Sequence, residues 1–151
     1  MSNIEEQNLT EFLLEVKAKM VNITTSENIE INNINEYVLK NSGKFIRSKI
    51  IYLYGSEIGV RNQKLIELAS AAELIHLSTL IHDDIIDEAD LRRDMPTVVK
   101  KWGVKKAILY GDFLYTKTFH GLNSFDNTAI ANVLINCAEA LIEGEFNQLK
   151  I

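Results

Sequence analysis

Only one proline, Pro96, occurs in the 151-residue chain, and apolar residues recur at helical spacing on both sides of it. Proline breaks helices more strongly than any other residue, since it lacks a backbone N–H and disfavours the αR conformation in the residue before it. Strand-type alternation is sparse, whereas apolar spacings of three and four residues are typical of helices that pack through one face. The pattern therefore predicts an all-α chain.

Turn residues divide this pattern into segments. We predict helices over about 4–22, 31–41, 45–59, 62–88, 98–121 and from about 126 to the end. Gly43 follows the second of these segments, Gly59 ends the third, and a loop through Pro96 follows the fourth. No internal repeat or low-complexity linker separates the segments, so we expect a single domain, whole or partial, over residues 1–151.

Charge and cysteine content exclude several classes of protein. A net charge of −5 with scattered arginines argues against a nucleic-acid-binding surface. The single cysteine, Cys137, lies among apolar residues, which predicts an inert core thiol and suits a reducing compartment. The acidic N-terminus does not resemble a signal peptide, and no apolar run approaches the roughly 20 residues of a membrane span. We therefore expect a soluble, cytoplasmic protein without a transmembrane segment.

Five of the seven aspartates lie between residues 83 and 94, and the first three form a DDxxD cluster of Asp83, Asp84 and Asp87. On a helix, Asp83 and Asp87 lie one turn apart on one face, and Asp84 lies at the edge of the same arc. These carboxylates repel one another and crowd the end of the helix where the macrodipole disfavours anions. A hard divalent cation would relieve both effects, so the cluster predicts a metal site.

Further polar residues share the face of the aspartate cluster. His76 lies two turns before Asp83, and Thr79 lies between them. Arg92 and Arg93 follow the cluster and offer planar guanidinium groups that suit bidentate contacts to phosphate.

A second group of cations lies earlier in the chain, where Lys44 and Arg47 follow Gly43 at the start of a predicted helix. A helix N-terminus with two cations favours an anion. Carboxylates and cations in one cavity together predict a ligand that combines a metal ion with phosphate groups.

The ordered set of segments resembles the first half of the trans-isoprenyl diphosphate synthases, the polyprenyl synthetase family. The resemblance implies the N-terminal half of the isoprenoid synthase helical bundle, ending before the second aspartate-rich motif of the family. The segments that carry it are Gly43-Lys44-x-x-Arg47, Glu73–His76, Leu80–Asp87, Asp90–Arg93 with Pro96-Thr97, Gly111–Leu114, and Glu143-Gly144-Glu145 with Gln148.

The resemblance also implies a reaction, in which a trans-polyprenyl diphosphate is elongated by condensation of an allylic diphosphate with isopentenyl diphosphate. Asp83, Asp84 and Asp87 would bind Mg²⁺ that coordinates the allylic diphosphate, and Arg92 would contact the same group. The isopentenyl diphosphate would be held by Lys44, Arg47, His76 and Arg93. A homodimer is expected.

Small residues before the aspartate cluster bear on product length. Ser78 and Thr79 occupy the positions where large aromatic side chains would block a growing prenyl tail. A medium or long-chain, octaprenyl-like product is therefore expected. Phe113, Tyr115 and Phe119 are candidates for the floor of the cavity.

The chain departs from the usual family motif Gly-Gly-Lys-Arg-x-Arg-Pro at two informative positions, since Phe45 replaces the first arginine and Ser48 replaces the proline. After Asp94 the sequence contains only the isolated Asp112 and Asp126, and its last helix lacks a stop signal. We therefore expect a fragment that is inactive alone. The alternative is a non-catalytic partner subunit of a heteromeric prenyltransferase. A fragment of a class I terpene cyclase would not explain the lysine and arginine positions.

Overall fold

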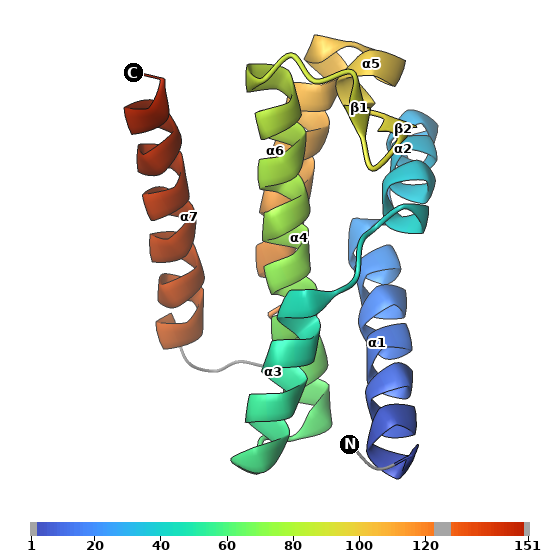
Figure 1. The fold of residues 1–151 in the computed structure, drawn as a ribbon, viewed down its shortest axis with the longest axis vertical. Helices are drawn as coiled ribbons and strands as arrows, with labels where there is room; N and C mark the ends of the chain where they lie inside the picture. The colour runs from blue at the N-terminus through green and yellow to red at the C-terminus, as the bar shows by residue number, and fades with distance from the viewer. Residues whose placement is uncertain (1–2, 123–127, 150–151) are drawn as a thin grey trace.

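The computed structural model describes residues 3–122 and 128–149, and these residues form a helical bundle with one short β-hairpin. The central pair of helices is α4 and α6, which make the most extensive contact between elements (Figure 1). In the same view α1 and α7 lie on opposite sides of this pair. The helices are α1 (Asn3–Thr24), α2 (Ile29–Lys40), α3 (Ile46–Glu57), α4 (Asn62–Ile86), α5 (Val98–Trp102), α6 (Val104–His120) and α7 (Thr128–Gln148).

The all-α prediction is confirmed, but the predicted helix over 98–121 is wrong. Gly103 divides it into α5 and α6, because its φ of 84° lies outside the helical region. The start of α5 is set by Thr97, whose side chain accepts a hydrogen bond from the backbone N–H of Lys100 at 3.2 Å.

Helix α4 forms the centre of the bundle. Within the described residues it is also the one helix long and apolar enough to cross a membrane by length and composition, which the sequence analysis did not anticipate. Its 18-residue apolar window is 61% buried by the neighbouring helices. The apolar character of α4 is therefore accounted for by its place in the core.

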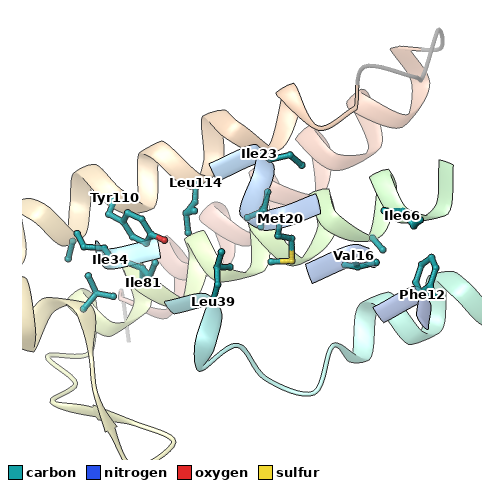
Figure 2. Close-up of a cluster of buried hydrophobic side chains, with 14 of the residues drawn as sticks. Phe12, Val16, Met20, Ile23, Ile34, Leu39, Ile66, Ile81, Tyr110 and Leu114 are labelled. Carbon is teal, nitrogen blue, oxygen red and sulfur yellow. The ribbon is translucent and has the colours of Figure 1, made fainter. Parts of the chain in front are cut away.

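The core lies along α4, where side chains from α1, α2 and α6 meet it (Figure 2). Met20, Leu74 and Leu114 are fully buried in this cluster. Tyr110 is also buried, and its hydroxyl donates a hydrogen bond of 2.8 Å to Asn35 Oδ1. The Asn35 amide in turn donates to the backbone oxygen of Thr24 at 2.6 Å. A buried polar chain thus joins α6, α2 and α1.

A small residue permits the close contact between α4 and α6. A Cβ atom at Gly111 would overlap the imidazole ring of His82, so glycine allows this ring to lie against the backbone of α6. The hydroxyl of Ser78 donates a hydrogen bond of 2.9 Å to the backbone oxygen of Gly111. Both contacts hold the aspartate-bearing end of α4 against α6.

Helix α7 buries little of its surface. Among its described side chains only Ala138 is buried, whereas Val133, Leu141 and Phe146 are exposed. Cys137 is exposed as well, so the prediction of an inert core thiol is wrong. The helical periodicity identified α7 correctly but could not show that most of its apolar side chains are exposed among the described residues.

Candidate functional site

A β-hairpin follows α4, where the sequence predicted a loop. Strand β1 (Leu91–Arg92) pairs antiparallel with β2 (Met95–Pro96). The two residues between them, Arg93 and Asp94, have φ values of 53° and 63°. Positive φ at both central positions is typical of a tight type I′ turn, although side chains other than glycine and asparagine adopt it at some cost. The turn separates Arg92 and Arg93, whose side chains reach different partners.

Arg92 binds the second aspartate of the DDxxD cluster. Its Nε and Nη2 atoms lie 2.9 and 2.8 Å from the same carboxylate oxygen of Asp84. Asp84 is only 4% exposed, and this pairing compensates its buried charge. The sequence analysis placed Asp84 at the edge of the arc shared by Asp83 and Asp87, and its role as a metal ligand stays a prediction. The carboxylate of Asp84 points to the hairpin.

The other two aspartates stay accessible at the end of α4. Asp83 is partly buried, and its pKa is raised by loss of hydration first, then by the charge of Glu145, with smaller contributions from Asp87 and Asp84, while Arg92 opposes the rise. Asp87 is exposed and forms the C-cap of α4. Glu145 therefore brings a carboxylate from α7 toward the cluster.

The sequence analysis did not assign Glu145 to the site, although it lies within the Glu143-Gly144-Glu145 segment that carried part of the resemblance. Across residues 3–122 and 128–149, no three His, Cys, Asp or Glu side chains are arranged as a ready metal centre. The predicted ligands are thus near one another without forming a complete coordination shell.

The predicted anion-binding residues come together in one pocket, here called the basic pocket. Lys44, Arg47, His76 and Arg93 line it, together with Gly43 and Glu73. A Cβ atom at Gly43 would overlap the guanidinium of Arg93, so glycine lets Arg93 lie directly against the backbone there. Residues more than 40 positions apart are thereby brought to one cavity. Their role as diphosphate ligands stays a prediction.

The electrostatics of the basic pocket favour an anion. The pKa of His76 falls from 6.5 to about 4, because of burial first and then because of the charges of Arg47, Arg93 and Arg92. The imidazole is therefore neutral near pH 7, and three guanidinium groups raise the electrostatic potential at its position. An anion bound there would relieve the repulsion among these cations.

A second pocket adjoins the basic pocket beneath the hairpin. Leu77, Leu80 and Arg93 line both pockets, and Asp84 and Arg92 line only the second. Apolar side chains from α2, α4, the hairpin and α5 complete its wall, namely Val38, Ile81, Met95 and Val98. The arrangement places an apolar surface next to groups suited to phosphate.

The residues predicted to influence product length face different surroundings. Ser78 is buried between α4 and α6, bonded to Gly111 as described above. Thr79 is partly buried, and its hydroxyl donates a hydrogen bond of 2.9 Å to the backbone oxygen of His76 on the same helix. The hydroxyl of Thr79 thus has its hydrogen-bond partner within α4. The role of Thr79 in product length stays a prediction.

Comparison with known proteins gives consistent matches. Residues 28–151 match the family described as polyprenyl synthetase. The octaprenyl diphosphate synthase of Escherichia coli is 34% identical over 119 residues, which cover 79% of this chain and 37% of that protein. Component 2 of the heptaprenyl diphosphate synthase of Geobacillus stearothermophilus is 30% identical over 142 residues, which cover 94% of this chain and 44% of that protein.

A solved structure agrees with these matches. The polyprenyl synthase of Caulobacter crescentus, in complex with calcium and isoprenyl diphosphate, superimposes with a TM-score of 0.89 at 26% identity. The superposition covers 95% of this chain and 44% of that one. The chain thus spans less than half the length of each of these three proteins.

Proposed function

Because the chain belongs to the polyprenyl synthetase family, we propose that it supplies the diphosphate-binding part of a prenyltransferase. The reaction elongates a trans-polyprenyl diphosphate by joining an allylic diphosphate to isopentenyl diphosphate. The observation that carries this proposal is the basic pocket, which Lys44, Arg47, His76 and Arg93 line beside an apolar cavity. Burial and then the charges of Arg47, Arg93 and Arg92 lower the pKa of His76 there. Such a combination suits a ligand with an anionic head and a hydrocarbon tail.

Isopentenyl diphosphate is assigned to the basic pocket. Lys44 offers a compact positive charge, whereas Arg47 and Arg93 offer planar groups that donate several hydrogen bonds to phosphate oxygens. His76 is neutral before binding and can donate one further hydrogen bond. All four side chains line the same pocket, which supports their assignment to one diphosphate.

The allylic diphosphate is assigned to the end of α4 near Arg92. Two carboxylates one helical turn apart, Asp83 and Asp87, fit a hard divalent cation such as Mg²⁺, and the pKa of Asp83 is raised partly by the other carboxylates nearby. Asp84 does not fit as a ligand while it is paired with Arg92. When bound, the metal ion would neutralise diphosphate oxygens. The calcium in the Caulobacter crescentus structure supports a divalent ion of this kind.

The residues of this chain would act mainly by stabilising charge. The allylic C–O bond breaks with its electron pair leaving on the diphosphate, and Arg92 lies near the negative charge that develops. The double bond of isopentenyl diphosphate supplies the electrons of the new C–C bond, and loss of a proton completes the step. Leu77, Leu80 and Ile81 line the adjoining apolar pocket. There they would exclude water from the allylic carbocation that is left when the C–O bond breaks.

The proposed product is a medium or long-chain polyprenyl diphosphate. Thr79 is the position at which a large side chain would shorten the product in any assembly where the chain is active. Ser78 is the less suitable position for this test, since a phenylalanine there would first disturb the contact with Gly111.

We propose a homodimer in the cytoplasm, and the exposed apolar residues along α7, among them Val133, Leu141 and Phe146, offer a surface that a second protein could cover. A component of a heteromeric prenyltransferase is the second candidate, favoured by similarity to a protein named as component 2.

Calorimetric titration with inorganic pyrophosphate tests the basic pocket directly. We expect the 151-residue chain to bind it and the double variant Lys44→Ala, Arg47→Ala to lose at least tenfold in affinity, about 1.4 kcal/mol. Lys19→Ala is the matched control, on α1. Absence of binding by the wild-type chain would overturn the proposed function.

Transfer of labelled isopentenyl diphosphate to farnesyl diphosphate tests catalysis. We expect no elongation by the chain alone, because no second aspartate-rich segment follows Asp94 in this sequence. Turnover by the chain alone would refute this part of the proposal.

A further inference from the structure

Helix α3 begins without a cap of its own. Its N-cap residue is Phe45, which has a φ of 51° and makes no side-chain capping bond. The first intrahelical hydrogen bond runs from Lys49 N to Phe45 O at 3.0 Å. The N–H groups of the first helical turn therefore need acceptors from elsewhere.

Glu73 of α4 supplies such an acceptor. Its Oε1 atom accepts hydrogen bonds from the backbone N–H of Ser48 at 3.1 Å and from the Ser48 hydroxyl at 2.9 Å. Ser48 is the third residue of α3 and is fully buried, and Glu73 is only 7% exposed. The third N–H of a helix is commonly bonded by the N-cap side chain, so Glu73 replaces a local cap across 25 residues of sequence.

The hydrogen-bonded residues Ser48 and Glu73 adjoin the basic pocket. Glu73 lines that pocket one helical turn before His76, and Arg47 immediately precedes Ser48. The two hydrogen bonds thus link the segment that carries Lys44 and Arg47 to the helix that carries His76. A proline at position 48 could make neither bond, because it has no N–H and no hydroxyl.

We propose that Ser48 and Glu73 are a positioning pair, which holds Lys44 and Arg47 at the separation from His76 that a diphosphate requires. The inference rests on the proposed function of the basic pocket. Glu73 would act through its acceptor oxygen and not through its charge, since a negative charge beside the pocket opposes anion binding.

The test is affinity for inorganic pyrophosphate, measured by calorimetry. We expect Glu73→Leu to weaken binding about tenfold and Ser48→Ala, which keeps the N–H bond, to weaken it about threefold. Glu73→Gln retains an acceptor oxygen and should bind at least as tightly as the wild type. In a background with both Lys44→Ala and Arg47→Ala, Glu73→Leu should cause little further loss, because both side chains that it positions are gone.

The matched control is Asn28→Ala, which removes the cap of α2, where Asn28 Oδ1 accepts from the backbone N–H of Glu30 and Ile31. It should lower stability without changing pyrophosphate affinity. If Glu73→Leu binds pyrophosphate like the wild type, the positioning role is wrong while the proposed function stands. If the wild type does not bind it, both are wrong. Should Glu73→Leu fail to fold, Ser48→Ala and Glu73→Gln decide the question.

Discussion

Arg92 donates a hydrogen bond of 2.9 Å from Nε to one carboxylate oxygen of Asp84, and its Nη2 atom forms an ion pair with the same oxygen at 2.8 Å. The second aspartate of the DDxxD cluster is therefore a structural partner of the hairpin, and the first and third remain available to a cation. To contact a diphosphate, the guanidinium of Arg92 must either bind Asp84 and the diphosphate together or move away from Asp84.

Loss of Arg92 should destabilise the protein. Arg92→Met leaves the Asp84 carboxylate buried without its partner, and since Arg92 is itself 38% exposed, we expect a loss of about 1–3 kcal/mol in the free energy of unfolding. Urea denaturation measures it. The exposed pair of Lys100 and Asp90 is the control, where Lys100→Met should cost less than about 1 kcal/mol. Equal losses at the two positions would contradict the buried pairing.

His76 should titrate far below an ordinary histidine. Its folded-state pKa is lowered to about 4, so NMR should show a neutral imidazole at pH 6. Pyrophosphate should raise this pKa, because it offsets the charges of Arg47, Arg93 and Arg92 that depress it. A pKa that stays unchanged on addition of pyrophosphate would place the anion elsewhere.

The same pKa implies a dependence of stability on pH. The unfolded state takes up a proton on His76 near pH 6.5 and the folded state only near pH 4. The contribution of His76 to the free energy of unfolding is therefore fully present above pH 6.5 and is lost as the pH falls toward 4, since protonation favours the unfolded state. His76→Gln should therefore lose stability less steeply than the wild type across this range in pH-dependent denaturation. Parallel curves for the two proteins would refute it.

Divalent-cation binding should depend on Asp83 and Asp87. Asp83→Asn and Asp87→Asn should each weaken Mn²⁺ binding at least tenfold in electron paramagnetic resonance titrations, about 1.4 kcal/mol. Because the pKa of Asp83 is raised, a proton competes with the metal, so the affinity of the wild type should fall as the pH is lowered. Asp94→Asn is the control, since asparagine also tolerates its φ of 63°. A loss at Asp94 as large as that at Asp83 would sink the assignment.

The buried polar chain should contribute to stability. Tyr110→Phe removes the donor to Asn35 Oδ1, and an unsatisfied buried acceptor costs about 1–3 kcal/mol. Urea denaturation measures the loss. Tyr54→Phe is the control, because Tyr54 is 74% exposed and should change stability by less than about 0.5 kcal/mol. The interpretation fails if both variants match the wild type.

Helix positions were largely predictable, since they depend on local periodicity. The predicted segments 4–22 and 62–88 lie within two residues of α1 and α4 at each end. The predicted helix over 98–121 ran through Gly103, because a glycine within an apolar helical pattern can either be tolerated or end the helix, and the sequence does not distinguish the two. The hairpin gave no such local indication, since Arg93 and Asp94 adopt positive φ without a glycine.

The sequence by itself determined the helical bundle, the acidic cluster at the end of α4 and the set of cations that meets in the basic pocket. The helices and the acidic cluster depend on apolar period and residue type, which are local properties, whereas the set of cations was expected from the resemblance to the polyprenyl synthetase family. Only the tertiary structure decided that Asp84 forms an ion pair with Arg92 and that Glu145 approaches Asp83. It also decided that Glu73 accepts the hydrogen bond that caps α3. Burial and Coulomb energy depend on distances between elements far apart in the chain, and spacing along the sequence does not specify them.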